Sequence, residues 1–155
     1  MISPRPADIL LVEDDPHDVE LTLRALKKAR LSNRIHVARD GADALDYLCR
    51  EGAHSGRAPG EEPSLVLLDL KLPKVDGLGV LRRLKSDGRT REIPVVVLTS
   101  SKEESDIAAA YKLGVNSYIV KPVDFEQFSE TARQLGYYWL LVNRQPAESA
   151  SAPAS

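Results

Sequence analysis

The sequence predicts an α/β protein in which a five-stranded parallel sheet, of strand order 2-1-3-4-5, is doubly wound by helices. Short apolar runs alternate along the chain with stretches of helical periodicity, which is typical of βα units around a buried parallel sheet. The 155 residues suit one such domain. They are too few for the larger dinucleotide-binding version of this architecture.

Five elements are expected in the first half of the chain from its apolar runs and turn signals. Asp15 is the expected N-cap of the first helix, because Pro16 follows it at the first helical position. The elements are a strand that ends near Asp14, a helix from Pro16, a strand over 34–38, a helix from Gly41 to Cys49 and a strand over 65–68.

The second half repeats the alternation of strand and helix. Residues 101–104 read Ser-Lys-Glu-Glu, which matches a capping box and is expected to start a helix. The expected elements are a helix over about 78–85, a strand over 93–98, a helix from the capping box to Gly114, a strand over 117–120 and a last helix from near Asp124.

The domain is predicted to span residues 7–143, including an extension of its last helix. Residues 1–6 are expected to form an N-terminal tail, and residues 144–155, rich in small side chains, a disordered C-terminal tail. The loop over 51–63 is rich in Gly, Pro and charge, and it is expected to be a surface insertion. No output domain is expected to follow.

Composition excludes several classes of function. The formal net charge is −2, from 21 basic and 23 acidic residues, which favours neither nucleic acid nor an anionic membrane as partner. No apolar run approaches the length of a membrane span. The single cysteine, Cys49, rules out an internal disulfide and favours a reducing, cytoplasmic location.

Polar residues stand where four predicted strands end: Asp14, Asp69, Thr99 and Lys121. The carboxyl ends of parallel strands share one edge of the sheet, and ligands bind there, at the switch point between strands one and three. With Glu13, the edge gathers up to three carboxylates, which favours a hard cation such as Mg²⁺. Asp14 and Asp69 are therefore expected to face the strand ends rather than solvent.

Each of these residues also has an ordinary structural interpretation. An acid can cap a helix, the lysine can form a structural ion pair, and Thr99 can belong to a helix-entry turn. Four such residues at four parallel strand ends favour a shared pocket for a divalent cation and a phosphoryl group instead.

Over residues 7–135 the chain resembles the response-regulator receiver domain of the CheY-like, chemotaxis-regulator type. The matching motifs, which occur in the family's order, are the acidic run Glu13-Asp14-Asp15, the loop from Asp69 to Gly77, Thr99 and Lys121-Pro122. The resemblance implies a phosphoacceptor that promotes its own phosphorylation and dephosphorylation, and not an enzyme.

The resemblance also implies a role for each matching residue. Asp69 would take a phosphoryl group from the phosphohistidine of a histidine kinase. Asp14 would bind Mg²⁺ directly, Glu13 would bind it through water, and Asp69 and the backbone carbonyl of Lys71 would complete the protein ligands.

Three further roles follow from the same resemblance. Lys121 would hold one phosphoryl oxygen, and Thr99 would hydrogen-bond another. Tyr118 matches the family's switch aromatic, which occupies space that an inward movement of Thr99 frees.

A strongly apolar segment continues beyond the receiver pattern. It either packs on its own domain or forms a homodimer interface, and six large apolar residues favour the dimer. Stand-alone receivers that serve bacterial phytochromes end in a similar way, which indicates a bacteriophytochrome as the kinase. The expected interface residues are Tyr137, Tyr138, Trp139, Leu140, Leu141 and Val142.

Three other classes fit less well. A Mg²⁺-dependent phosphohydrolase would need a second Asp where the chain has Lys71, and a flavodoxin-like cofactor binder would not place Glu13 and Asp14 beside a phosphate. A docking module that is never phosphorylated is disfavoured, because every site residue is present. Whether the protein signals or serves as a phosphate sink stays open.

Overall fold

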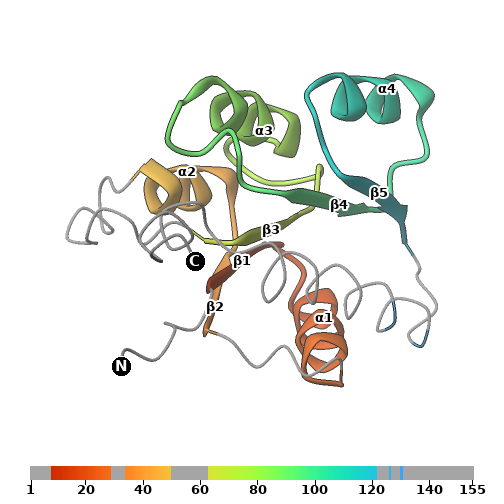
Figure 1. The fold of residues 1–155 in the computed structure, drawn as a ribbon. Helices are drawn as coiled ribbons and strands as arrows, with labels where there is room; N and C mark the ends of the chain where they lie inside the picture. Colours follow the sequence, from red (N-terminus) through yellow and green to blue (C-terminus); the bar gives the residue numbers. More distant parts are fainter. Residues whose placement is uncertain (1–7, 29–33, 50–62, 122–125, 127–129, 131–155) are drawn as a thin grey trace, which may run out of the picture.

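The computed structural model of the protein describes residues 8–28, 34–49, 63–121, 126 and 130. All strand pairs are parallel, and the sheet has the order β2-β1-β3-β4-β5, as the sequence predicts (Figure 1). The elements are β1 (Asp8–Val12), α1 (Pro16–Lys28), β2 (Arg34–Ala38), α2 (Gly41–Cys49), β3 (Leu65–Leu68), α3 (Gly77–Ser86), β4 (Val95–Thr99), α4 (Glu104–Lys112) and β5 (Ser117–Val120).

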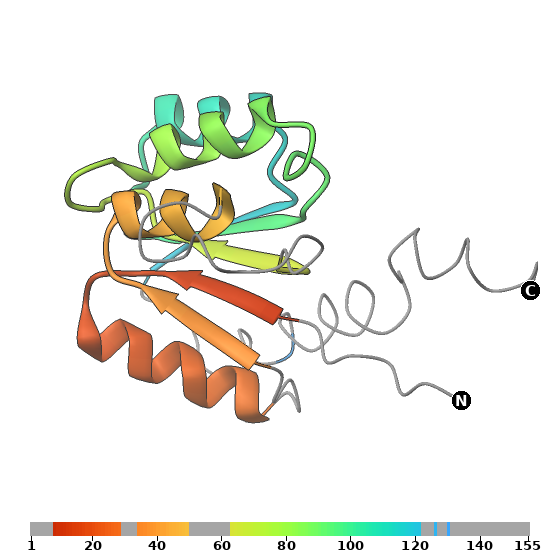
Figure 2. The same cartoon turned by 90° about the vertical axis from the view of Figure 1, so that its left-hand side faces the viewer.

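Helices cover both faces of this sheet, so the domain is doubly wound. Helices α2, α3 and α4 lie on one face and α1 lies on the other (Figures 1 and 2). The predicted last helix and its extension lie outside the described residues, except that Glu126 and Glu130 are helical. The tails and nearly all of the 51–63 loop also lie outside them. Among the described helices, none is long and apolar enough to cross a membrane.

The strand side chains divide between two cores, because successive residues of a strand point to opposite faces of the sheet. One core lies between the sheet and helices α2, α3 and α4, and the other lies between the sheet and α1. Alternate residues of the same strands belong to the two cores. The first contains Leu10, Val12, Val66, Leu68, Val95 and Val97, and the second contains Ile9, Leu11, Leu65, Leu67 and Val96 together with Val19 and Leu26 of α1.

The predicted cap of α1 is confirmed. Asp15 Oδ1 accepts a hydrogen bond from the backbone N–H of His17 at 2.8 Å, and α1 begins at Pro16. The predicted end of α4 is also confirmed, since Gly114 follows the helix with a φ of 100°, a conformation that glycine adopts without strain.

Two sequence predictions in the second half are wrong in detail. The capping box does not form, because α4 starts at Glu104 and its N-cap is Glu103, which makes no side-chain cap. Ser101 lies two residues before that cap, where its Oγ accepts from the N–H of Glu103 at 3.3 Å and donates to Asp106 Oδ2 at 2.6 Å. Strand β4 starts at Val95 rather than Ile93. The N–H of Ile93 is taken by the carbonyl of Thr90, and Pro94 has no N–H to donate.

The loop between β3 and α3 lies in close contact with two glycines, Gly41 at the start of α2 and Gly77 at the start of α3. Gly41 donates its N–H to the Pro73 carbonyl at 3.2 Å, and Gly77 donates to the Leu70 carbonyl at 3.0 Å. A Cβ atom at Gly41 would collide with the backbone of Val75, and one at Gly77 with the backbone of Asp69. The loop that begins at Asp69 is therefore fixed by close backbone approach, for which glycine is required.

Replacing Gly41 by Ala is expected to lower the free energy of unfolding by about 1–3 kcal/mol, because the new methyl group must displace the backbone at Val75. Gly88→Ala is the control, since nothing lies within 4 Å of a Cβ at that position. Urea denaturation of both variants checks the prediction. Equal stabilities for the two variants would show that the loop does not need this close approach.

Candidate functional site

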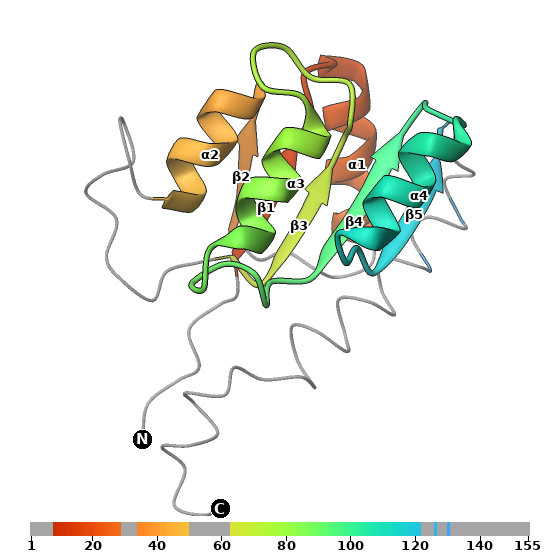
Figure 3. The same ribbon diagram turned by 90° about the horizontal axis from the view of Figure 1, so that it is seen from above.

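The four predicted strand ends meet at one edge of the sheet. Strand pairing aligns Val12 with Leu68 and Leu68 with Val97, so the residues that follow these strands are neighbours. Asp69 donates its N–H to the Val12 carbonyl at 3.0 Å, and Lys121 donates its N–H to the Thr99 carbonyl at 2.8 Å. Figure 3 shows the strands side by side and pointing the same way.

Lys121 lies at the centre of this edge. Its ammonium donates to Glu13 Oε1 at 2.7 Å, to Asp18 Oδ2 at 2.8 Å and to Asp69 Oδ2 at 3.1 Å. The lysine side chain is only 14 % exposed. Burial disfavours its charged form, but the hydrogen bonds to Asp18 and Glu13 and the negative charge of Asp69 outweigh burial and raise the pKa of Lys121.

Glu13 is the most buried acid of the group, with 2 % of its side chain exposed. Burial raises the pKa of Glu13 to about 7, and the negative charge of Asp69 adds to the increase. The hydrogen bond from Lys121 opposes this shift without cancelling it. Five acids and two lysines line the cavity at this edge, so the acids outnumber the bases.

Three carboxylates could share a metal ion. Oxygen atoms of Glu13, Asp14 and Asp69 all lie within 4.8 Å of one another. Hard divalent cations such as Mg²⁺ prefer oxygen ligands of this kind, and the excess negative charge suits a divalent cation. Asp14 is exposed, so the expectation that it faces away from solvent is wrong: the β1 ladder ends before it, and the residue stands on the turn into α1.

The segment after β3 orients the central carboxylate. The N–H of Lys71 donates to Asp69 Oδ1 at 3.0 Å, while Lys121 binds the other oxygen, Oδ2. One oxygen of Asp69 is thus held by a backbone N–H and the other by the Lys121 ammonium, and the Asp69 side chain is 7 % exposed.

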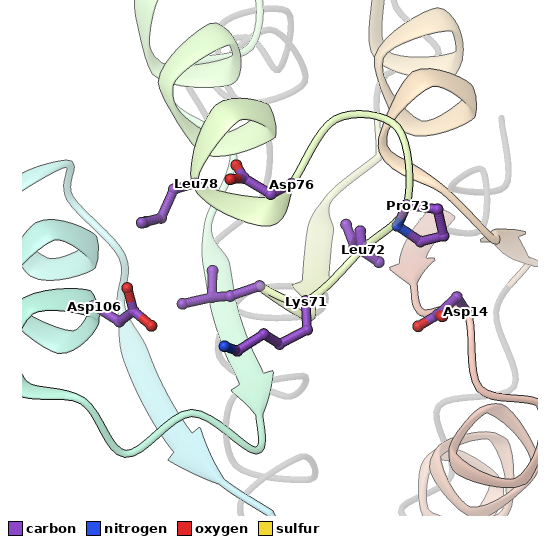
Figure 4. Close-up of a pocket in the computed structure, with 8 residues that line it drawn as sticks. Asp14, Lys71, Leu72, Pro73, Asp76, Leu78 and Asp106 are labelled. Atoms are coloured by element: carbon purple, nitrogen blue, oxygen red, sulfur yellow. The ribbon is translucent and has the colours of Figure 1, made fainter.

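Two cavities adjoin at Asp14 and Lys71. One, of about 490 Å³, is lined by Asp69, Lys121 and neighbouring residues of the cluster. The other, of about 450 Å³, runs between the segment after β3 and α4. In Figure 4 the Lys71 side chain extends across this second cavity toward Asp106. The site is open to solvent along the segment that carries Asp69.

Thr99 and Tyr118 both contact Ser101. The Thr99 side chain is buried and its Oγ1 accepts from the N–H of Ser101 at 3.4 Å, while the Tyr118 hydroxyl donates to the Ser101 carbonyl at 3.1 Å. Burial raises the pKa of Tyr118, so the phenol stays a hydrogen-bond donor at neutral pH. The segment after β4 therefore links the end of that strand to the tyrosine of β5.

The structure brings together four of the predicted site residues, Glu13, Asp14, Asp69 and Lys121, whereas the described side-chain hydrogen bonds of Thr99 and Tyr118 are with Ser101. Sequence reasoning missed one contributor, Asp18. It stands in the first turn of α1, where acids are common because they favour the helix N-terminus. Nothing in the sequence distinguishes Asp18 from an ordinary acid of a first helical turn, and only its contact with Lys121 in the folded protein identifies it. The expected dimer segment, 137–142, lies outside the described residues.

The fold and this site define an α/β domain with an acidic pocket and a lysine at the switch point of its sheet. Residues 9–133 match the response regulator receiver domain. The chain belongs to this family, whose members are phosphoacceptors rather than classical enzymes.

Several relatives are similar over nearly the whole chain. A probable methanogenesis regulatory protein, FilR2 of Methanothrix harundinacea, is 47% identical over 91% of this chain and 88% of its own length. The structure of the bacteriophytochrome response regulator AtBRR is 55% identical, with a TM-score of 0.74, over 91% of this chain and 100% of that one.

Two further solved structures are of a phosphorylated and of a metal-bound response regulator. The phosphorylated cyanobacterial phytochrome response regulator RcpA is 38% identical with a TM-score of 0.79, and the alignment covers 92% of this chain and 99% of that one. The Mn²⁺-bound form of response regulator Rcp1 is 36% identical with a TM-score of 0.78, over 91% and 99%.

Stability without metal is expected to depend on the protonation of Glu13. Its pKa of about 7 in the folded protein exceeds the ordinary value of 4.5, so folding favours the protonated form. This contribution is complete below the ordinary pKa and is lost as pH rises through about 7. In the presence of a chelator, it should decrease the free energy of unfolding by on the order of 2 kcal/mol between about pH 5 and about pH 8.

Urea denaturation across this pH range measures the effect, and Glu13→Gln should remove most of it. Glu20→Gln is the control, because Glu20 is exposed on α1 and pairs only with Arg24 among the interactions described for it. If the Glu13→Gln variant and the wild-type protein showed the same pH dependence, the proton would not reside on Glu13.

Proposed function

We propose that the protein is a response regulator of a two-component system that accepts a phosphoryl group from a histidine kinase on Asp69 in a Mg²⁺-dependent reaction. The observation that carries this proposal is the state of the Asp69 carboxylate, which is buried, fixed at both oxygens and surrounded by a cation and two further acids. The description of RcpA as phosphorylated supports it.

In the proposed reaction an oxygen of Asp69 attacks the phosphorus atom of phosphohistidine. A P–O bond forms while the P–N bond breaks, and the imidazole nitrogen keeps the electron pair of that bond. Lys121 compensates negative charge on the transferred group, because phosphoryl transfer depends mainly on positioning and charge neutralisation. The N–H of Lys71 holds the other oxygen of Asp69 and so fixes the direction of attack.

The metal would be held by Glu13, Asp14, Asp69 and the backbone carbonyl of Lys71. When bound, Mg²⁺ supplies positive charge to the phosphoryl oxygens and screens the carboxylates from one another. The description of Rcp1 as Mn²⁺-bound supports a divalent cation at this place.

Thr99 and Tyr118 form the proposed switch. If the Thr99 hydroxyl donated to a phosphoryl oxygen, it would move away from the Ser101 N–H, from which it now accepts a hydrogen bond. Because the Tyr118 hydroxyl is bonded to the carbonyl of the same Ser101, the two side chains would move together. The new arrangement would present a different surface to a partner protein.

The proposed kinase is a bacteriophytochrome, and the proposed location is the cytoplasm. Support comes from AtBRR and RcpA, which are described as phytochrome response regulators, although FilR2 is named for a different pathway. Light-dependent transfer of phosphate from a bacteriophytochrome kinase to this protein would test the assignment. Equal transfer in light and darkness would count against a light-regulated partner.

We also propose that the apolar segment 137–142 forms a homodimer interface. Sedimentation of the wild-type protein with and without phosphorylation is expected to show a dimer, and Trp139→Glu together with Leu140→Glu should give a monomer. A wild-type protein that stays monomeric in both states would instead favour packing of this segment on its own domain.

Incubation with Mg²⁺ and a small acyl phosphate is expected to add one phosphoryl group to the wild-type protein. Asp69→Asn should carry none, and a chelator should prevent the reaction, because acceptor and charge neutralisation are then missing. Intact mass measured before and after incubation checks both. A wild-type protein that takes up no phosphoryl group would favour an unphosphorylated docking module, and one that transfers its phosphoryl group back to the kinase would favour a phosphate sink.

A further inference from the structure

We propose that Asp18 is a positioning residue that holds the Lys121 ammonium in place for phosphoryl transfer to Asp69. This inference rests on the function proposed above. Asp18 Oδ2 accepts from Lys121 Nζ at 2.8 Å, which is shorter than the 3.1 Å between the same nitrogen and Asp69 Oδ2. Asp18, which the sequence did not predict as a site residue, is thus one of the two closest partners of Lys121.

The start of α1 fixes Asp18 in this position. The Asp15 cap binds the N–H of His17 and, at 3.4 Å, the N–H of Asp18 itself. The next residue, Val19, is 5 % exposed and packs in the core between α1 and the sheet. Asp18 is therefore anchored on both sides along the chain, and 28 % of its side chain is exposed.

Asp18 differs from the other two acids that bind Lys121 in what the reaction does to it. Glu13 belongs to the cluster of carboxylates suited to a metal ion, and Asp69 forms the new bond to phosphorus. Asp18 takes part in neither event. An ammonium has three N–H donors, and in this structure each of them meets one carboxylate. Asp18 is therefore the acid that stays bound to Lys121 when Glu13 binds the metal and Asp69 is phosphorylated.

A lysine side chain is flexible and needs a fixed partner to stay in one place. With Asp18 present, one N–H stays directed at α1, and an N–H that leaves Asp69 can turn to a phosphoryl oxygen. Without Asp18, the ammonium would be shared between Glu13 and Asp69 alone, where it would compete with the metal and cover the attacking oxygen. Removing the Asp18 charge is therefore expected to slow phosphorylation.

The test compares the rate of phosphorylation by a small acyl phosphate in the wild type, Asp18→Asn and Glu20→Gln at saturating Mg²⁺. Asp18→Asn should react about tenfold more slowly, because it loses a charged hydrogen bond that is partly shielded from solvent. Glu20→Gln is the matched control and should change the rate by less than about twofold. It removes one negative charge from the same helix, at an exposed side chain that pairs with Arg24.

Two further variants separate positioning from a purely structural role. In a Lys121→Ala background, replacing Asp18 by Asn should have no further effect on the rate, because the proposed action passes through the lysine. Asp18→Glu keeps the charge and should recover most of the rate lost in Asp18→Asn. In the wild type, the Lys121 ammonium hydrogens should exchange with solvent more slowly than in Asp18→Asn, as followed by ¹⁵N-resolved NMR.

Unchanged or faster phosphorylation of Asp18→Asn would overturn the proposal, as would an effect that persists without Lys121 or a folded Asp18→Glu variant as slow as Asp18→Asn. If Asp18→Asn does not fold, the rate of Asp18→Glu and its ammonium exchange decide the question. Failure of wild type and Glu20→Gln to be phosphorylated at all would instead contradict the proposed function.

Discussion

The contact between one buried ammonium and three carboxylates is the interaction on which the functional edge of this protein depends. Lys121 joins the end of β5 to β1, β3 and α1 through Glu13, Asp69 and Asp18. Burying an unpaired charge is costly, and the three carboxylates offset that cost for the Lys121 ammonium. The parallel register of the sheet makes the contact available, because it brings residues distant in the sequence to one edge.

The same cluster holds a surplus of negative charge, and this surplus links stability to function. Five acids and two lysines line the cavity, and burial raises the pKa of Glu13 because it disfavours the charged form of that carboxyl. A site arranged only for stability would match its charges or replace them by apolar groups. This one instead keeps an arrangement that a divalent cation and a phosphoryl group would complete.

The sequence was sufficient to predict the strand order and the strand-end residues, because a polar residue directly after a continuous apolar run has few other places to lie. Two features were beyond it. Asp18 carries the same signal as any acid in a first helical turn, and only the packing of α1 shows that it meets Lys121. The capping box at Ser101 failed because α4 begins at Glu104, and Ser101 instead bonds to the N–H of Glu103 and to Asp106. Local motifs do not reveal partners that tertiary structure supplies.

The unequal exposure of the three clustered acids has a consequence for how the site is filled. Asp14 is open to solvent, whereas Glu13 and Asp69 are buried. A divalent cation bound as proposed would therefore have one ligand that solvent reaches directly and two that the domain shields from it. Exchange of such an ion would require no opening of the domain, because the exposed carboxylate already stands at the surface.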